Sequence, residues 1–417
     1  METEHESLAK AFNKELFLIK NDLYYQQVDV HKNGKHELLR LDISYKPYSE
    51  LSGDTYSLRK TKDGRLVGFV ADAMGKGISA AISAMGLTRF LNYFFDELED
   101  EGAFVFDVWA KKIVKFLQKN LFDEEIMCLS LMEFDMTHSL VRYASCGMPA
   151  FYAQLLNGEV VALKSNNPPL ASYSENVEIK TLISTQVQKM ICYTDGLSES
   201  AMEDGRPYNT LLKEDFKQAI DVIDFRQKVE KAIGKGEDDL TYVYIQKFEF
   251  RQEFENIFIP STYEAIDDVL HSLSLYLKSH RIESKQSNEV LLALSELLMN
   301  ALEHGSFGVN KMHKNYLLEH NLFDEEMIKL ESLNQSKMIH IRYGMLPRGE
   351  QKLLELSIKD EGNGFNTHIL KELVINPHTV NGRGFVIVKK LLDHFYFNEK
   401  GNTVTIQKLL RQGSQLQ

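Results

Sequence analysis

The stretch Ser57–Gly75, SLRKTKDGRLVGFVADAMG, decides the fold of the first half of the chain. Strand-forming residues flank its central Asp-Gly dipeptide, which is a strong signal for a two-residue hairpin turn. Pairing about that turn sets Thr55 opposite Asp72 and Asp54 opposite Ala73. We therefore expect Asp54 and Asp72 on neighbouring strands, within one residue of register, where opposed side chains lie about 5 Å apart.

Two carboxylates this close repel each other unless a proton or a cation lies between them. The alternative is a phosphate loop at Lys76, but the lysine has neither the earlier glycine nor the following Ser/Thr of that motif. Two further acidic sites border strand-like runs, one at Asp195 and one at Asp238-Asp239. Each alone is a common turn, but together they favour a hard-oxygen site for Mg2+ or Mn2+.

The ordered motifs resemble PPM-type metal-dependent phosphatases, in the bacterial branch of sporulation stage II and stress-response phosphatases. The motifs are SGDTY (52–56), DAMGKG (72–77), TDGLSES (194–200) and DDLT (238–241). The resemblance implies a β-sandwich flanked by helices and a centre of two Mn2+ or Mg2+ ions. It implies as metal ligands Asp54, Asp72, the Ala73 carbonyl, Asp195 and the Asp238-Asp239 pair, whose first residue matches the ligand position. No arginine matches a phosphate-binding position.

Coarse patterns separate two halves of the chain, with a switch near FEFRQEFEN (248–256). The first half predicts strands and two helices, near 77–98 and 104–120. The second half predicts helices near 262–279, 286–304 and 383–394 and strands near 337–344, 352–359 and 402–409.

The second half carries its own set of polar residues. Glu296, Asn300 and His304 recur every four residues on one helical stripe, which by itself is also the pattern of a polar helix edge. Asp360 then ends a strand, and a Gly-x-Gly pair precedes the last helix, whose N-terminal amides can receive phosphates. The glycines of this set are Gly362, Gly364, Gly382 and Gly384.

This ordered set resembles the GHKL (Bergerat) ATPase fold, an α/β sandwich, and most closely the anti-sigma-factor serine kinases. The resemblance implies that Asn300 holds Mg2+ on the ATP phosphates and that Asp360 accepts from the adenine amino group. It implies that the four glycines let a lid close on nucleotide and that Glu296 is the base for a serine hydroxyl. The charged insertion at 306–337 departs from that family and has helical patterning, as expected of a cap, a lid or a partner surface.

The composition is that of an ordinary globular protein, with 43% hydrophobic and 26% charged residues. The net charge of -12 argues against nucleic-acid binding, which needs a basic face. We find neither a bilayer-spanning apolar run nor a secretory signal pattern, so no membrane partner is expected. Cys128, Cys146 and Cys192 are scattered, and we interpret them as reduced thiols of a cytoplasmic protein.

Residues 5–27 have helical spacing without Pro or Gly, and predict either a helix packed on its own domain or a signalling or dimerising helix. The expected domains are an N-terminal helical segment (1–35), a phosphatase domain (36–250) and an ATP-binding domain (251–417). Together they predict an α+β and α/β two-domain protein.

The two resemblances imply a bifunctional partner-switching regulator. It would dephosphorylate phosphoserine or phosphothreonine on a small STAS-type anti-sigma antagonist, and would act as an ATP-dependent serine kinase or anti-sigma factor. A sigma factor, an upstream receiver or sensor, or a second copy in a homodimer are further partners in this hypothesis. Two alternatives stay open: an ATPase domain that only binds nucleotide or partner, and a module that sequesters partners without chemistry.

Overall fold

The protein is represented by a computed structural model, which forms two compact units. It describes residues 26–32, 35–48, 52–75, 77–102, 104–135, 138, 140–183, 187–234, 238–248, 254–365 and 383–411. The first unit contains the described residues from Asp29 to Phe248. The second contains Gln26–Val28 together with the described residues from Phe254 to Arg411.

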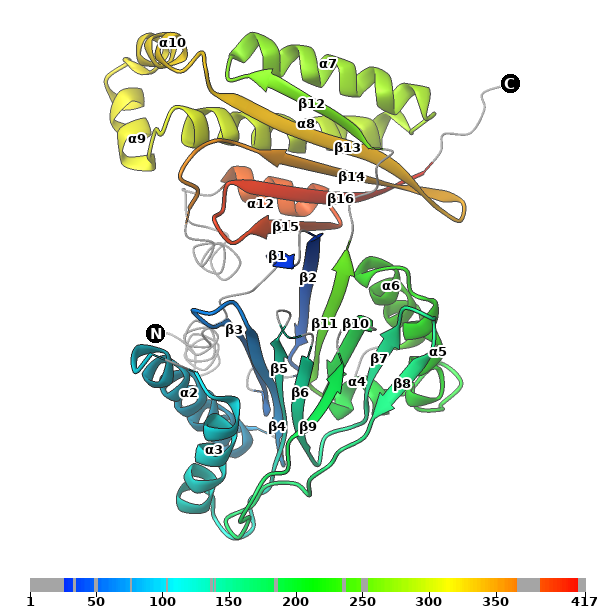
Figure 1. The fold of residues 1–417 in the computed structure, drawn as a ribbon. Helices are drawn as coiled ribbons and strands as arrows, with labels where there is room; N and C mark the ends of the chain where they lie inside the picture. Colours follow the sequence, from blue (N-terminus) through cyan, green and yellow to red (C-terminus); the bar gives the residue numbers. More distant parts are fainter. Residues whose placement is uncertain are drawn as a thin grey trace, which may run out of the picture. The chain divides into compact units, whose positions relative to one another are not determined.

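The first unit is built on two antiparallel groups of strands. One sheet has the order β3-β4-β5-β6-β9, and in the other β2, β11, β10, β7 and β8 follow one another. Figure 1 shows the two sheets facing each other, with helices outside both, which confirms the expected β-sandwich flanked by helices. The strands are β2 (Lys35–Lys46), β3 (Asp54–Lys60), β4 (Leu66–Ala73), β5 (Met127–Asp135), β6 (Leu140–Cys146), β7 (Phe151–Leu155), β8 (Val160–Leu163), β9 (Lys180–Ile183), β10 (Val187–Tyr193) and β11 (Leu240–Phe248).

The helices of this unit bury their apolar faces on the sheets. The core under the first sheet joins Phe69 and Leu131 of the strands to Leu87 and Trp109 of α2 and α3. The buried indole of Trp109 donates to the Leu91 carbonyl at 3.1 Å, which satisfies its polar atom. The helices are α2 (Ile78–Asp100), α3 (Phe106–Asn120), α4 (Asp195–Glu199), α5 (Asn209–Gln218) and α6 (Val222–Ala232).

The β3–β4 hairpin corrects the predicted register by one residue. Asp54 lies opposite Asp72, not Ala73, and Thr55 lies opposite Ala71. The turn holds three residues, Lys62 to Gly64, because Thr61 closes it by donating its N–H to the Arg65 carbonyl at 2.8 Å. Gly64 takes a φ of 90°, the left-handed position that ends such three-residue loops.

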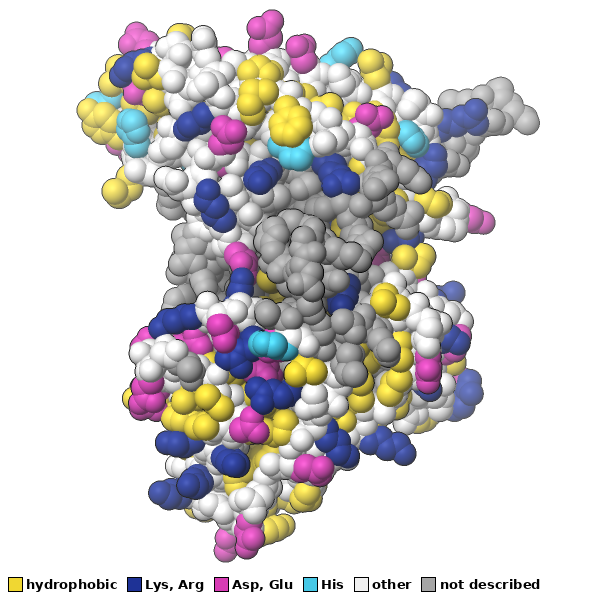
Figure 2. Space-filling model, viewed as in Figure 1, with side chains coloured by type: hydrophobic (Ala, Val, Ile, Leu, Met, Phe, Trp, Pro, Cys, Tyr) yellow, Lys and Arg dark blue, Asp and Glu magenta, His cyan; other side chains and the backbone are white. Residues whose placement is uncertain are grey.

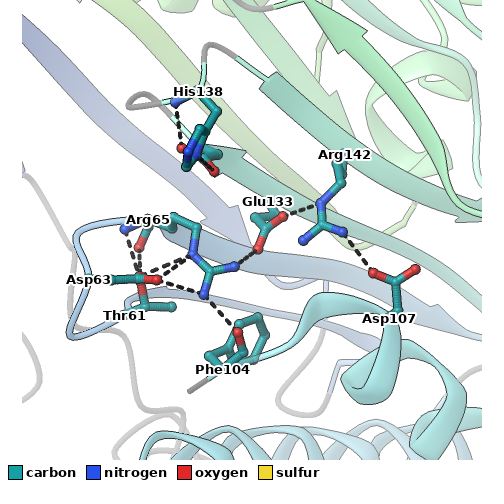
Figure 3. Close-up of polar contacts among 9 residues, drawn as sticks. Thr61, Asp63, Arg65, Phe104, Asp107, Glu133, His138 and Arg142 are labelled. Atoms are coloured by element: carbon teal, nitrogen blue, oxygen red, sulfur yellow. Dashed lines mark hydrogen bonds and ion pairs between the residues drawn. The ribbon is translucent and has the colours of Figure 1, made fainter. Parts of the chain in front are cut away.

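An ion network centred on the buried Glu133 ties this hairpin to α3 (Figure 3). Glu133 is fully buried and accepts from Arg65, with 2.6 Å between Oε1 and Nη1, and from Arg142. Arg142 also binds Asp107 in the first turn of α3, and Arg65 donates to the Phe104 carbonyl, both at 2.7 Å. Since each charge has a partner, the network holds the helix layer at the turn end of the sheet.

The second unit has an antiparallel sheet of order β12-β13-β14-β16-β15. Gln26 and Gln27 extend it by pairing in parallel with Phe397 and Asn398. The helix predicted for 5–27 is therefore wrong at its last two residues, which belong to strand β1; residues 1–25 lie outside the described residues. The strands are β12 (Glu255–Pro260), β13 (Met338–Arg348), β14 (Gln351–Lys359), β15 (His394–Asn398), β16 (Thr403–Arg411) and the first three residues of β1 (Gln26–Lys32).

Helices α7, α8 and α12 of the second unit lie on one face of this sheet, and α9 and α10 lie beside its end (Figure 1). The N-cap of α7, Thr262, accepts the Ala265 N–H at 3.2 Å, and helix α8 ends in a π-helix that sequence periodicity did not predict. The elements are α7 (Tyr263–Ser279), α8 (Ser284–Asn300), the π-helix η2 (Ala301–Ser306), α9 (Lys311–Glu319), α10 (Phe323–Leu333) and α12 (Arg383–Leu391).

The insertion at 306–337 is a helical hairpin, α9 and α10, as its patterning predicted. Lys314 of α9 forms an ion pair with the buried Glu303 of the π-helix, and Glu331 of α10 accepts the N–H of Tyr263 at 3.3 Å. The insertion is therefore anchored to the element that directly follows Asn300.

The charge distribution on the surface and the state of the cysteines fit the expectations from the composition. On the face shown in Figure 2, acidic and basic side chains are interspersed within each unit. The three cysteines are free thiols, and Cys146 and Cys192 are buried. Within the described ranges, no helix combines the length and the apolar character that crossing a bilayer requires.

Candidate functional site

The first candidate site begins with two carboxylates that face each other. Asp54 starts β3 and Asp72 lies near the end of β4, directly opposite. Asp54 is buried and accepts a hydrogen bond from the Thr194 hydroxyl at 2.8 Å. Thr194 in turn accepts the Thr241 N–H at 3.1 Å, so one hydroxyl links the hairpin to the ends of β10 and β11.

Both carboxyl groups have raised pKa values. Burial, followed by the charge of Asp72, raises the pKa of Asp54 well above its usual range. Burial also raises the pKa of Asp72 to about 7, with the charges of Asp195 and Asp238 as the next causes. Acids from four separate segments thus share one electrostatic environment, in which the charged forms disfavour one another.

Backbone packing brings the last two acidic segments together. A Cβ on Gly196 would lie 1.9 Å from the Asp239 carbonyl oxygen, so only glycine fits after Asp195. Both carboxylate oxygens of Asp239 accept backbone N–H groups, from Tyr48 at 2.8 Å and from Gly53 at 2.9 Å. Asp239 thereby holds the residue before Asp54 beside the site.

The donor set suits a hard divalent cation, because it consists of carboxylates and a nearby backbone carbonyl, that of Ala73. The Ala73 carbonyl oxygen packs 3.0 Å from where a Cβ on Gly53 would lie. As the side chains stand, no three carboxylate, imidazole or thiolate groups of the described residues converge as a metal-holding group. Asp54 and Asp239 are turned instead to protein donors. Lys76 lies outside the described residues.

The second candidate site joins the end of α8 to the end of β14. Glu296 and Asn300 are half-buried, one turn apart on α8, as predicted. The His304 ring does not continue that regular stripe, because the π-helix intervenes and its Nδ1 contacts the Val309 carbonyl. Asp360 follows β14 and accepts the Gly362 N–H at 2.7 Å. Burial raises the pKa of Asp360 to about 6, against the lowering effect of that N–H.

Three glycines make this site compact. A Cβ on Gly305 would lie 2.4 Å from the Asp360 Cγ, and one on Gly362 would lie 2.4 Å from the Gly305 carbonyl oxygen. Gly364 has a φ of 73° and packs against the Lys400 carbonyl. Gly384 lies in α12, whereas Gly382 lies outside the described residues.

Three residues that sequence reasoning missed or did not assign to a site help to build them: Thr194, Gly196 and Gly305. Thr194 and Gly196 flank Asp195 within a quoted motif, so their position gave a signal. The sequence signal for Gly305 was weaker, since its role depends on the π-helix, which the apolar periodicity does not predict.

The chain matches two family models in succession. Residues 62–248 match Stage II sporulation protein E, and residues 259–408 match the Histidine kinase-like ATPase domain. The chain thus combines a PPM-type phosphatase domain with a GHKL-type ATPase domain. More particularly, its first domain is of the stage II sporulation protein E family. The first match includes Asp72, Asp195 and Asp238 and begins after Asp54.

Individual relatives and solved structures match this chain over 39% to 94% of its length. The Phosphoserine phosphatase RsbP of Bacillus subtilis (strain 168) is 26% identical over 173 residues, which are 39% of this chain and 41% of that protein. The chain therefore spans less than half of that relative. A solved structure of the RsbU and RsbW domains of Rv1364c from Mycobacterium tuberculosis is 17% identical, covers 94% of this chain and 98% of its own, and has a TM-score of 0.45. A SpoIIE phosphatase structure from Bacillus subtilis is 18% identical, covers 50% of this chain and 63% of its own, and has a TM-score of 0.41.

Proposed function

We propose that the chain is a bifunctional partner-switching regulator, with a phosphatase domain at 36–250 and an ATP-binding domain at 251–417. The phosphatase would remove phosphate from serine or threonine of a small STAS-type antagonist protein. The second domain would bind ATP and act as a serine kinase and anti-sigma factor. The observation that supports the phosphatase function is the direct opposition of Asp54 and Asp72. Asp72 also lies close enough to Asp195 and Asp238 that their charges add to the effect of burial in raising the pKa of Asp72.

In the phosphatase domain, Asp54, Asp72, Asp195, Asp238 and the Ala73 carbonyl are the proposed ligands of Mn2+ or Mg2+. Bound cations would supply Lewis acidity toward phosphoryl oxygens and would acidify a water molecule. Asp239 has a positioning role, because its two backbone hydrogen bonds fix the loop before Asp54. Water would attack phosphorus as the bond to the serine oxygen breaks, and that oxygen would leave with a proton.

In the ATPase domain, Asp360 would accept from the adenine amino group with the oxygen that Gly362 does not occupy. Asn300 would hold the Mg2+ that accompanies ATP, and Glu296 would take the proton of the incoming serine hydroxyl. Gly362, Gly364, Gly382 and Gly384 would permit close backbone approach to the nucleotide. The insertion's anchorage on Glu303 supports a cap or partner surface next to this site.

The test incubates the purified full chain with a STAS-domain protein in two forms, one phosphorylated on serine and one not. With Mn2+ or Mg2+ the chain should release phosphate from the first form, and with labelled ATP it should label the second. Labelling that persists in Glu296→Gln would contradict the assigned base. ATP binding without any labelling would leave a phosphatase joined to a nucleotide-binding module.

A further inference from the structure

Large apolar side chains are exposed in the segment that directly follows Asp72 of the candidate phosphatase site. Met74 lies two residues after Asp72, and Ile78 and Ile82 lie on the first two turns of α2. Each of these three side chains is between 58% and 61% exposed. Large hydrophobic side chains grouped on a surface in this way mark interaction sites.

A loop after α3 lies along the start of α2 and carries a fourth exposed apolar side chain. Glu125 accepts from the Ser83 hydroxyl of α2 at 3.1 Å and from the Phe122 N–H at 2.9 Å. The Met74 N–H donates to the Ile126 carbonyl at 3.0 Å, so the loop runs along the start of α2. Phe122 is 72% exposed. We call Met74, Ile78, Ile82 and Phe122 the apolar rim.

The opposite face of α2 makes the contacts that hold the helix against the sheet. It buries Ala80, Ala84, Leu87 and Leu91 in the core. Further along, Ser57 of β3 donates to Asn92 at 2.9 Å, and Arg59 of β3 pairs with Asp96 at 2.7 Å. These contacts hold the helix on the sheet without the apolar rim, which leaves the rim available to a partner.

The position of the rim defines that partner. A phosphoserine side chain is short, so a phosphoryl group that reaches Asp72 brings the residues beside the phosphoserine onto the surface around the site. Met74 begins that surface on one side, and Tyr48, whose N–H donates to Asp239, is exposed on another. Apolar side chains next to the phosphoserine would be removed from water there.

We propose that the apolar rim binds the residues flanking the phosphoserine of a protein substrate, and so selects substrates with apolar neighbours at that position. The proposal rests on the proposed phosphatase function and adds a substrate class to it. It assigns Ile78 and Ile82 to specificity, with no part in the chemistry.

The test uses the full chain and two phosphoserine peptides of equal length and net charge. One has leucine and valine beside the phosphoserine, and the other has glycine and serine there. Hydrolysis is compared with that of 4-nitrophenyl phosphate, which has no flanking residues, and peptide binding is measured separately by fluorescence anisotropy. The variant is Ile78→Ser/Ile82→Ser, and the matched control is Tyr93→Ser, an exposed residue further along the same helix.

Wild type should prefer the apolar peptide about tenfold or more in kcat/KM and in affinity, a preference of the size that partial burial of two such side chains gives. The double variant should lose this preference while 4-nitrophenyl phosphate turnover stays within about twofold. Tyr93→Ser should keep the preference. Equal binding of both peptides by wild type, or an unchanged preference in the double variant, would overturn the proposal.

Two results would assign the apolar rim to another occupant and would therefore also overturn the proposal. Loss of self-association in the double variant, measured by sedimentation, would indicate a second copy. New protease sensitivity of residues 1–25 would indicate the chain's own N-terminal segment. Failure of wild type to hydrolyse any of the three phosphate esters with Mn2+ or Mg2+ would contradict the phosphatase function. The anisotropy comparison would still show whether the apolar rim binds the apolar peptide in preference to the other.

Discussion

Gly305 and Asp360 pack together with no room for a side chain between them, since a Cβ on Gly305 would approach the Asp360 Cγ to 2.4 Å. Gly305 belongs to the π-helix that follows Asn300, and Asp360 directly follows β14. Their contact therefore sets the spacing between the two residues that we assign to the phosphates and the adenine of ATP.

Gly305→Ala should lower ATP affinity at least about tenfold, because the added methyl group must displace the Asp360 carboxylate from its place against the π-helix. Calorimetric titration with ATP-Mg2+ measures this. The control is Gly86→Ala on α2, where no atom lies within 4 Å of the added Cβ. Phosphatase turnover should be unchanged in the Gly305 variant, and wild-type ATP affinity in that variant would show that the contact does not position Asp360.

Asp360→Asn should abolish ATP binding and yet stabilise the nucleotide-free domain at pH 8. The pKa of Asp360 is about 6 in the folded state against an ordinary value of 3.8, so the folded domain bears the cost of a buried carboxylate above pH 6. This cost declines as the pH falls through 6 and vanishes below the unfolded pKa, where both states are protonated. Asparagine keeps an acceptor for the Gly362 N–H.

The expected gain in the free energy of unfolding at pH 8 is on the order of 1–3 kcal/mol, roughly halved at pH 5. Scanning calorimetry of the full chain at both pH values follows the unfolding of the second domain. Destabilisation by Asp360→Asn at pH 8 would mean that hydrogen bonds of the carboxylate outweigh its desolvation.

The sequence predicted the Asp54–Asp72 opposition only to within one residue, and the reason lies in the turn. An Asp-Gly pair is compatible both with a two-residue loop and with a three-residue loop that ends in a left-handed glycine. The choice depends on Thr61 and Arg65 closing the ladder, and nothing in the local pattern separates the two geometries.

The helix of Glu296 and Asn300 was predictable because its apolar period is regular, but its π-helical end was not. One extra residue per turn at 301–306 is stabilised by long-range contacts, among them Ser306 with Ser261 at 2.7 Å and Glu303 with Lys314. Similarly, the roles of Gly196 and Gly305 depend on which strand end meets them. Contacts between segments that are distant in the chain are the features that are hardest to predict from a single sequence.

Asp72→Asn and Asp195→Asn should each lower hydrolysis of 4-nitrophenyl phosphate and of a phosphoprotein about a hundredfold or more, because each would replace a proposed carboxylate ligand by a neutral amide, which is a weaker ligand for the cation that stabilises developing charge. Activity should require Mn2+ or Mg2+ and should be restored by metal after chelation. The matched control is Asp204→Asn, an exposed carboxylate paired with Arg206. Full activity of wild type in the presence of chelator would exclude the metal mechanism.

Glu133→Gln should destabilise the first domain by about 3 kcal/mol, since it removes the negative charge of a fully buried carboxylate that lies between two half-buried guanidinium groups. In the variant Arg65 still pairs with Asp63, and Arg142 still pairs with Asp107. The expected loss of stability is therefore at the lower end of the range for breaking a buried ion pair. Urea unfolding monitored by Trp109 fluorescence measures the change. Arg206→Gln removes an exposed pair and should leave the urea midpoint nearly unchanged; equal effects of the two substitutions would show that burial does not strengthen the network.

Deletion of residues 1–25 tests how the two proposed activities would be kept from running at once, because a kinase and a phosphatase acting on one serine would otherwise hydrolyse ATP to no purpose. The segment lies outside the described residues, but its sequence carries an apolar stripe at helical spacing, Leu8, Phe12, Leu16, Ile19 and Leu23. The truncation stops at residue 25 because Gln26 and Gln27 pair with β15 in the ATPase domain.

We hypothesise that packing of this stripe, on the phosphatase domain or between two chains, sets the position of the Asp54–Asp72 hairpin, whose ligand geometry tolerates little displacement. The deletion should then change phosphatase turnover at least several-fold, which corresponds to roughly 1 kcal/mol in the barrier, and leave ATP affinity unaltered. A segment that only covers the core would instead lower the melting temperature and reduce both activities through unfolding. Turnover per folded molecule, measured beside a melting curve, separates the two: a folded truncated chain with wild-type turnover would exclude a regulatory role for this segment.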